Sequence, residues 1–422
     1  MQHTRAGTRW SRHSQAAACV GLLAGALILV ARPAGAFPGS TERVSVDGAG
    51  RESVGPSFAG PFESPPSISA DGRFVAFAAW ARNLAPGDTN GFGDVFVHDR
   101  GTGVTERLSV DGAGTEANDT IHQPAISADG RFVAFVSAAT NLVPGDTNGQ
   151  SDVFVHDRQT RTTERVSVAS AGIEGHGWSD RPAISANGRF VAFVSAAPDL
   201  VPGDTNGRSD VFVHDRQTRR TERVSVDSAG TQADGDSASP ALSADGRFVA
   251  FSSSATNLVP GDTNGQADVF VHDRQVRTTE RVSVDSAGHE SDGWSDRPSI
   301  SAGGRFVAFC TFATNLVAGD TNGQWDEFVH DRRTGATERV SVDNAGTEAN
   351  ASSHGPSISA GGRFVVFASD ATNLVPGDTN GVRDVFVRDR GEASGESAMS
   401  ARRPANLRRN ALQGGIEERP AR

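Results

Sequence analysis

The chain contains no tyrosine and no lysine, has only two cysteines, and has no long hydrophobic run after its first 36 residues. Cys19 lies within that first segment, so Cys310 has no partner with which to form a disulfide framework. Cys310 occupies a position that holds Ala, Val or Ser in related segments of the chain, and we expect a plain buried thiol there. No stretch shows helical periodicity, which favours an all-β fold.

The N-terminal segment resembles a secretory signal. Arg5, Arg9 and Arg12 give it a basic start, residues 16–30 are apolar, and Ala34-Gly35-Ala36 is a small-residue cleavage sequence. We predict a signal peptide over residues 1–36, cleavage after Ala36, and a secreted, periplasmic or extracellular protein with no membrane insertion after cleavage. The alternative is an uncleaved anchor, although residues 19–30 alone are short for a membrane span.

Charge is distributed unevenly along the chain, whose formal net charge is −11. Residues 1–36 carry four arginines and no acid, and residues 391–422 carry six arginines and four glutamates, so residues 37–390 have a net charge of −17. This balance argues against nucleic acid or an anionic membrane as a partner and suits cations, basic proteins or neutral glycans. We expect a monomer. Residues 391–422 lack apolar periodicity and are predicted to form a disordered tail.

A 58-residue repeat runs through the chain six times without a slip. The string Gly-Arg-Phe-Val-(Ala/Val)-Phe begins at Gly72, Gly130, Gly188, Gly246, Gly304 and Gly362. A period of this length indicates a solenoid, a propeller or an array. A feature present in every copy is more often architectural than catalytic.

Each repeat has the pattern of four short antiparallel strands. In the second copy, residues 124–130 form a strand that ends in an Asp-Gly turn, residues 131–137 a second, 152–157 a third and 163–168 a fourth. The second and third strands are apolar on both faces, as expected for a blade covered by neighbouring blades. We therefore predict a six-bladed β-propeller of four-stranded antiparallel blades over residues 37–390.

The chain ends predict how the propeller closes. The fourth-strand sequence Thr-Glu-Arg-(Val/Leu)-Ser-Val first occurs at residues 41–46, before any other strand, and the last blade has no such sequence after residues 384–389. We expect residues 41–46 to complete the sixth blade, which would leave no open sheet edge.

The blade pattern Pro-x-(Ile/Leu)-Ser-Ala-(Asp/Asn/Gly)-Gly-Arg-Phe-Val-Ala-Phe, followed by Asp-Val-Phe-Val-His-Asp, resembles the repeat of TolB-type six-bladed propellers. The resemblance covers residues 66–390 and implies the propeller fold. Only residues 37–40 separate the signal segment from the first strand, so the N-terminal domain of TolB itself is expected to be absent. The surface that TolB uses for its envelope partner is therefore not carried over.

One long loop recurs in every copy as (Pro/Ala)-Gly-Asp-Thr-Asn-Gly-x-x-Asp. Its oxygen-bearing side chains are the ligands that Ca²⁺ prefers, and the spacing is similar to part of the calcium loops of integrin-type propellers. The equally open alternative is a structural Asx turn. The candidate calcium ligands are Asp88, Asn90, Asp94, Asp146, Asn148, Asp152, Asp204, Asn206, Asp210, Asp262, Asn264, Asp268, Asp320, Asn322, Asp326, Asp378, Asn380 and Asp384.

The other long loops vary, as the loops of a ligand-binding face would. Exposed tryptophans there could stack on a sugar or pack on a partner, or could simply cover the rim of a blade. His122, His176, His289 and His354 fall in these loops at positions judged not to match, which argues against a histidine ring. The candidate ligand-binding residues are Trp178, Asp180, Arg181, Trp294, Asp296, Arg297, His122, His176 and His354.

Histidines within the third strands, such as His98 and its counterparts, repeat with the architecture and are expected to be structural. The chain has no Gly-x-Ser-x-Gly elbow and no carboxylate pair outside the repeat pattern that stands out. We therefore predict a non-enzymatic binding or scaffold module for a protein or glycan at the cell surface, with Ca²⁺ as the candidate cofactor. The alternatives are a carbohydrate-active enzyme, hydrolase or lyase, at the mouth of the axis, and a structural protein without a small ligand.

Overall fold

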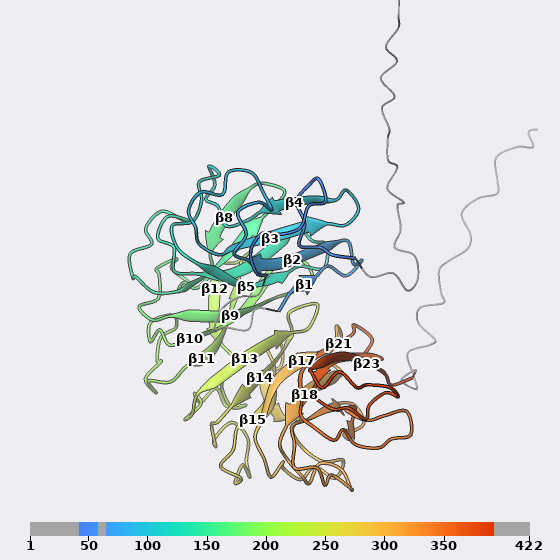
Figure 1. Cartoon of the computed structure of the whole chain (residues 1–422). Coiled ribbons are helices and arrows are strands. Elements are labelled where there is room, and N and C mark those ends of the chain that lie inside the picture. The colour runs from blue at the N-terminus through green and yellow to red at the C-terminus, as the bar shows by residue number, and fades with distance from the viewer. Residues whose placement is uncertain (1–41, 58–64, 392–422) are drawn as a thin grey trace, which may run out of the picture. The chain divides into compact units, whose positions relative to one another are not determined.

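The computed structural model describes residues 42–57 and 65–391, and the strands in these ranges form six sheets (Figure 1). The predicted signal segment, residues 1–36, and the predicted tail beyond Gly391 lie outside the described residues. The strands are β1 (Ser67–Ile68), β2 (Phe74–Ala79), β3 (Asp94–Asp99), β4 (Val104–Arg107), β5 (Ile121–Ile126), β6 (Phe132–Ser137), β7 (Asp152–Asp157), β8 (Thr162–Arg165), β9 (Ser179–Ile184), β10 (Phe190–Ser195), β11 (Asp210–Asp215), β12 (Arg220–Arg223), β13 (Ser237–Leu242), β14 (Phe248–Ser253), β15 (Asp268–Asp273), β16 (Thr278–Arg281), β17 (Ser295–Ile300), β18 (Phe306–Thr311), β19 (Asp326–Asp331), β20 (Ala336–Arg339), β21 (Ser353–Ile358), β22 (Phe364–Ser369) and β23 (Asp384–Asp389).

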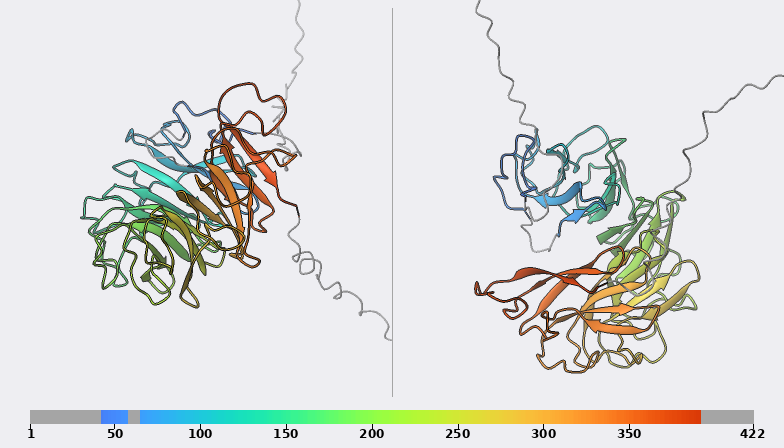
Figure 2. Two further views of the ribbon diagram at one scale, coloured as in Figure 1. Left: turned by 90° about the horizontal axis from the view of Figure 1, so that it is seen from below. Right: turned by 90° about the vertical axis from the view of Figure 1, so that its right-hand side faces the viewer.

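Every sheet is an antiparallel meander in chain order, and the six sheets follow one another along the chain (Figure 2). The first five sheets have four strands, and the sixth has three, β21-β22-β23. The fold is the predicted six-bladed β-propeller, and each sheet is one blade. In the described ranges, no helix has the length and hydropathy needed to cross a bilayer.

The middle two strands of each blade supply the core. In the third blade, Phe193 of β10 lies opposite Phe212 of β11, and their stacked rings are 5.9 Å apart between centroids. The valines and alanines on either side are also buried, because each face of the sheet is covered by a neighbouring blade. This burial explains why these strands are apolar on both faces.

Consecutive blades lock together through a phenylalanine and a glycine. The ring of Phe190, on β10, lies so close to Gly246 that a Cβ on this glycine would be 2.4 Å from the ring. Arg274 of the following blade also contacts this ring, with its guanidinium carbon 4.4 Å from the ring centroid. The same arrangement recurs from blade to blade, which is why Gly-Arg-Phe is the most regular part of the repeat.

First strands contact the first strands of neighbouring blades and therefore form the inner edges of the sheets. A backbone hydrogen bond also joins the turn between the first and second strands of one blade to the same turn of the next blade. In the second blade it runs from the backbone N of Ala128 to the carbonyl of Ala186, at 3.0 Å. Side chains on these first strands are thus brought towards the propeller axis.

The predicted strand boundaries need two corrections. The first strand of the second blade begins at Ile121, before the predicted residue 124, because a bulge with Gln123 at a positive φ of 54° lets the strand continue past Pro124. The fourth strand, β8, ends at Arg165 and does not reach residue 168. Val168 instead forms an isolated bridge to Glu174 within the connection to the next blade.

Closure by residues 41–46 is not formed in the described part of the chain. Thr41 lies outside that part, residues 42–44 form no strand, and β23 has no fourth-strand neighbour there. Val46 bridges Glu52, and the Asn83 amide holds the Glu52 carbonyl at 2.8 Å, so this segment is bound to the first blade. Val46 and Glu52 thus form the connection that follows the fourth strand in other blades. The residues just before Val46, which were expected to be that fourth strand, do not pair with β23 in the described part of the chain.

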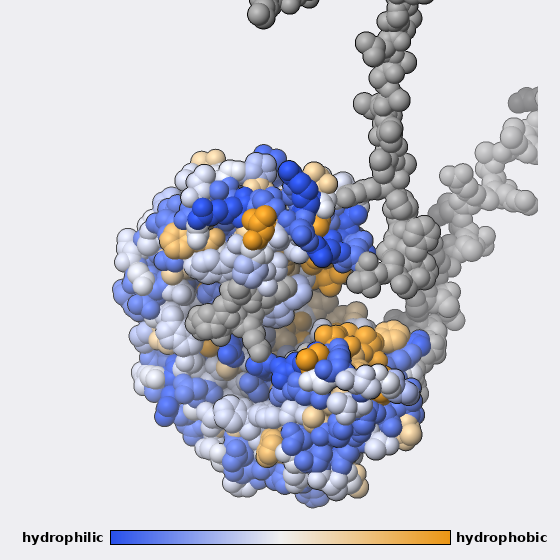
Figure 3. All heavy atoms as spheres, viewed as in Figure 1, coloured by the Kyte–Doolittle hydropathy of each residue, from blue (hydrophilic) through white to orange (hydrophobic). Residues whose placement is uncertain are grey.

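The sixth blade consequently presents an apolar face. Val387 is 63% exposed, whereas its counterpart Val213 in the third blade is fully buried. Val385 and Val366 are exposed on the same sheet, and Figure 3 shows hydrophobic surface gathered over β21 and β23. Pairing with residues 41–46 would satisfy the free edge of β23.

Candidate functional site

Most of the predicted ligand-binding residues lie on first strands, not in loops. Asp180 and Arg181 belong to β9, Asp296 and Arg297 belong to β17, and His354 belongs to β21. The sequence interpretation placed them in loops because a proline follows closely. The bulge in each first strand accommodates this proline and extends the strand towards the long-loop end of the blade.

His122 and His354 occupy equivalent positions, so the judgement that the loop histidines do not match was wrong for this pair. The position holds His122, Asp180, Ala238, Asp296 and His354 in the second to sixth blades. The next residue has a positive φ in each case, 51° at Arg181 and 53° at Arg297. Left-handed backbone at non-glycine residues is uncommon, and here the surrounding sheet imposes it in blade after blade.

Contacts join the second, third and fourth blades along these first strands. Nε2 of His122 is 3.9 Å from Oδ1 of Asp180. The backbone N of Arg181 donates to Oε1 of Gln123, and its Nη1 donates to Oγ of Ser239, each at 2.9 Å. Burial lowers the pKa of His122, which Asp180 partly opposes. This group is polar and fixed from blade to blade.

The two predicted tryptophans are exposed at the long-loop end, while His176 lies apart from the first strands. Trp178 is 40% exposed and Trp294 52%. His176 forms an ion pair with Asp199, which raises the pKa of the imidazole. Among the strand histidines, His98 is buried with its Nδ1 2.8 Å from the Thr105 hydroxyl, consistent with the structural role predicted for this set.

In the first five blades, the repeated loop brings its two aspartates to an arginine of the fourth strand. In the second blade, Nη1 of Arg165 is 3.2 Å from Oδ1 of Asp146, 3.3 Å from Oδ2 of Asp152 and 2.7 Å from Oε2 of Glu174. Arg165 comes from the fourth strand and Glu174 from the connection to the next blade. Neither was identified from the sequence, although Arg and Glu recur with the same 58-residue period.

The asparagine of the loop does not face this cluster through its oxygen. Oδ1 of Asn148 accepts a hydrogen bond of 2.8 Å from the backbone N of Gln150, which is an Asx turn. Its Nδ2 donates to Asp152 and to the carbonyl of Gly175. The same cap occurs at the other five loop asparagines, namely Asn90, Asn206, Asn264, Asn322 and Asn380.

Burial dominates the titration of the first loop aspartate. It raises the pKa of Asp146, Asp262 and Asp320 to about 6, even though an arginine lies beside each carboxylate. The Thr147 hydroxyl and backbone N, helped by Arg165, lower the pKa of Glu174 to about 2. The clusters therefore combine a readily protonated aspartate with a firmly ionised glutamate.

Two of these clusters could hold a metal ion. In the second and fourth blades, oxygens of Asp146, Asp152 and Glu174, and of Asp262, Asp268 and Glu290, lie within 4.8 Å of one another. Neither carboxylate oxygen of Asp262 has a hydrogen-bond partner. In the third blade Gln232 replaces the glutamate, which removes one carboxylate. Metal-capable geometry thus involves Glu174 and Glu290 in place of the predicted asparagines.

The fifth blade contains an acidic pair that the sequence interpretation overlooked. Glu327 is fully buried, both of its carboxylate oxygens lack a hydrogen-bond partner, and the other five blades have valine at this position. Oδ1 of Asp296 is also buried without a partner. Burial raises the pKa of Glu327 well above its usual range, with Asp326 adding to the rise and Arg297 opposing it. The sequence feature that could have revealed this pair is the change from Asp-Val-Phe in the other blades to Asp-Glu-Phe at residues 326–328.

Cys310 lies between these two acids. It is paired with Asp296 on one side and Glu327 on the other. Its thiol donates to the backbone oxygen of Asp296 at 3.3 Å, and burial raises the pKa of the thiol. The expectation of a plain buried thiol is confirmed.

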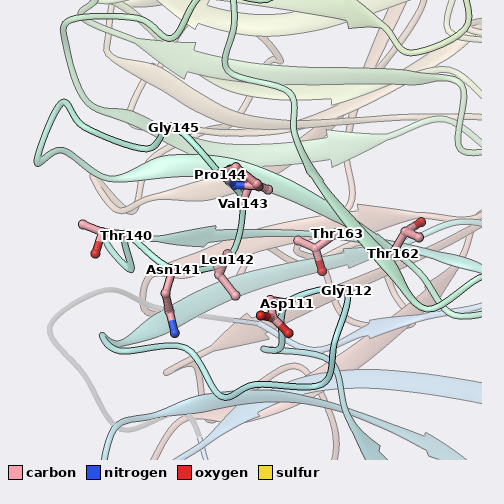
Figure 4. A pocket seen from close by; sticks show the side chains of 10 residues that line it. All are labelled: Asp111, Gly112, Thr140, Asn141, Leu142, Val143, Pro144, Gly145, Thr162 and Thr163. Carbon is pink, nitrogen blue, oxygen red and sulfur yellow. The ribbon is translucent and has the colours of Figure 1, made fainter.

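A hollow of about 550 Å³ lies elsewhere, between the first and second blades (Figure 4). Residues 140–145 of the loop after β6 line it, together with Asp111 and Gly112 of the connection after β4 and Thr162 and Thr163 of β8. None of the predicted site residues lines this hollow. Thr163 is occupied in holding the carbonyl of Val110 at 2.6 Å, so the contacts here serve to join blades.

No protein-family model matches the sequence, and no curated protein matches it. Among solved structures, the chain is similar to TolB from Acinetobacter baumannii, with 17% identity, a TM-score of 0.40, and coverage of 71% of this chain and 61% of that chain. A TolB structure from Agrobacterium tumefaciens gives 17% identity, a TM-score of 0.41, and coverage of 77% and 89%. An acylaminoacyl peptidase from Pyrococcus horikoshii gives 12% identity, a TM-score of 0.47, and coverage of 78% and 44%.

The chain thus spans less than two thirds of the Acinetobacter TolB chain and under half of the peptidase. The six antiparallel sheets themselves agree with the fold that the resemblance of the blade pattern implied.

Proposed function

We propose that this protein is a secreted, TolB-like β-propeller that acts as a non-enzymatic binding module for a glycan or protein at the cell surface. The observation that carries the proposal is the exposure of large aromatic side chains at the long-loop end of the fifth blade. Trp294 and Phe312 are 52% and 46% exposed, and the backbone N of Phe312 donates to the carbonyl of Trp294 at 3.0 Å. Adjacent exposed rings on a rigid sheet suit stacking on sugars or packing on a partner.

The test is binding of the full chain to an array of bacterial surface polysaccharides and wall fractions. Trp294→Ala combined with Trp178→Ala should weaken binding at least tenfold, because each removes an exposed stacking surface. Val276→Ala is the matched control, since Val276 is 58% exposed but lies in the β15–β16 turn at the opposite end of its blade. Undiminished binding by the double variant would contradict the proposal.

Secretion follows from the predicted signal at residues 1–36 and is part of the same proposal. N-terminal sequencing of the protein recovered outside the cytoplasm should give Phe37 as the first residue. We also propose that the module acts as a monomer and does not bind nucleic acid, since the acidic charge of residues 37–390 repels phosphates. Retention of full-length protein inside the cell would contradict the secretion proposal.

We further propose that Ca²⁺ binds the two metal-capable clusters. The proposal rests on three carboxylates in each cluster and on the oxygens of Asp262, which accept no hydrogen bond, although Oδ1 lies 3.3 Å from Nη1 of Arg281. Arg165 and Arg281 already neutralise part of the charge, so affinity should be weak, on the order of 0.1–1 mM. Calorimetry should show about two ions per chain instead of six, and Asp262→Asn should remove one. Absence of saturable heat would leave the loops as Asx turns only.

A carbohydrate-active enzyme is the second candidate, and the unrepeated acids of the fifth blade favour it. Burial raises the pKa of Glu327, as a general acid requires, and Asp296 is a second, half-buried carboxyl on the same blade. Reducing-end release from a polysaccharide panel, abolished by Glu327→Gln, would favour this function. No release from substrates that the protein binds would exclude it for those substrates.

A further inference from the structure

The fifth blade carries a row of three aromatic side chains that the second, third, fourth and sixth blades lack. Trp294 precedes β17, Phe312 follows β18 and Trp325 precedes β19, so all three lie at the long-loop end of adjacent strands. The Phe312 and Trp325 rings are 6.1 Å apart between centroids, and Trp325 also contacts the ring of His354 in the sixth blade. In the third blade, the row reads Trp178, Ala196 and Ser209.

Directly behind this row lies a second row on the same face of the sheet. Asp296, Cys310 and Glu327 are paired across the three strands, and each is two residues from one of the aromatic side chains. Residues two apart on a strand share a face, so both rows face the same side. The third blade has Asp180, Val194 and Val211 here, so it repeats the aspartate, and only the glutamate at position 327 is particular to the fifth blade.

The second row has acceptors without donors. Both oxygens of Glu327 and Oδ1 of Asp296 are buried with no hydrogen-bond partner, which is costly unless something completes the site. Glu327 is fully buried, whereas Asp296 is half-buried and lies on the first strand, nearer the propeller axis. Asp296 is thus the acid that a ligand reaches first. Arg297 supplies positive charge nearby, but its side chain is exposed.

We propose that the fifth blade binds a glycan that carries free amino groups, with a sugar ring against Trp294 and Phe312 and an ammonium group at Asp296. The inference rests on the proposed binding function and names its ligand class. An ammonium group brings three N–H donors and a positive charge to a site that has unpartnered oxygens and aromatic faces. The strongly acidic propeller attracts such a polycation over long range.

The experiment compares glucosamine hexamer with N-acetylglucosamine hexamer on the full chain at about pH 6, where amines are protonated. The two ligands offer the same rings, but only the first offers an ammonium group. We expect at least tenfold tighter binding of glucosamine hexamer. Equal affinities would overturn the ammonium assignment and leave the proposed function intact. Tighter binding of hexalysine than of either sugar would overturn the glycan assignment.

Two variants test the location, and the second takes its residues from other blades. Asp296→Asn, and the pair Phe312→Ala with Trp325→Ser, should each weaken binding of glucosamine hexamer about tenfold or more. The alanine and serine already occupy these positions in the third and second blades. Unchanged binding by either variant would overturn the site.

The matched control is Asp129→Asn at the opposite end of the second blade. Asn187 already fills that position in the third blade and accepts the same two hydrogen bonds, from Ser185 and Arg189. This variant removes one negative charge and should bind as the wild type does. If the control weakens binding as much as Asp296→Asn, only general charge attraction is at work and the site is refuted. If neither hexamer binds, the inference fails, and the proposed function fails with it only if the polysaccharide array is also blank.

Discussion

Replacing Glu327 with valine should stabilise the protein, by an amount that grows with pH. The carboxyl is fully buried, both of its oxygens lack partners, and valine occupies this position in the other five blades. Burying an uncompensated neutral polar group costs about 1–3 kcal/mol, so Glu327→Val should raise the free energy of unfolding by about that much under mildly acidic conditions.

The pH dependence follows from the raised pKa of the folded state. The unfolded chain releases this proton near the ordinary value of 4.5, while the folded protein retains it to well above that value. As the pH rises between these two values, the unfolded state gains stability by about 1.4 kcal/mol per pH unit and the folded wild type does not. The advantage of Glu327→Val should therefore grow as the pH rises from 4.5 towards the raised pKa of the folded state.

Urea denaturation at several pH values measures this difference directly. Glu327→Gln serves as the control, because it keeps an unpartnered polar group but has no proton to lose, so it should remove the pH dependence and recover less stability. Asp326 and Arg297 act on the charge of Glu327 and are present in all three proteins, and the Cys310 thiol, whose pKa burial and Glu327 raise, stays protonated below pH 7. A constant difference between wild type and Glu327→Val from pH 5 to pH 7 would refute the reasoning.

Two further predictions concern the repeated architecture. Arg281→Gln should lower the free energy of unfolding by about 3–5 kcal/mol, because it leaves the buried carboxylates around Asp262 without their cation, and added Ca²⁺ should restore part of the melting temperature; an unchanged melting temperature without Ca²⁺ would contradict this. Gly246→Ala should cost more than about 2 kcal/mol in urea denaturation, since its Cβ would overlap the Phe190 ring and the residue has a φ of +71°. Gly303→Ala, where no atom lies within 4 Å of the new Cβ and the φ is not left-handed, is the control, and equal losses from both would show that the ring contact does not matter.

Local pattern was enough to predict the blades. The Asp-Gly turn at Gly130 and the apolar strands on either side depend only on residues close together in the chain, and the structure has the hairpin where the pattern placed it. The 58-residue period then fixed the number of blades, because each unit buries its faces only against its neighbours. The buried setting of His98 and Cys310 followed from the same regularity.

Side-chain function was harder to predict, because it depends on contacts across strands and between blades. The loop asparagines were predicted as metal ligands, yet their side-chain oxygens cap their own turns. The aspartates are instead joined by an arginine and a glutamate that lie 13 and 22 residues after the second aspartate, as Arg165 and Glu174 do after Asp152. No local spacing rule connects these three. Asp180 and Asp296 were expected in loops because a proline follows each of them closely, and proline is unusual inside a strand. Only the structure shows that a bulge in the strand accommodates this proline.

The sequence by itself determined the all-β class, the six blades, the apolar middle strands and the acidic surface, since periodicity, turn residues and net charge are local or additive properties. Only the tertiary structure decided that Asp296, Cys310 and Glu327 share one row behind three aromatic side chains, because strand register brings together residues from three separate segments. It also decided that residues 42–46 do not pair with the edge of β23, since pairing between the two ends of the chain depends on the placement of every blade between them.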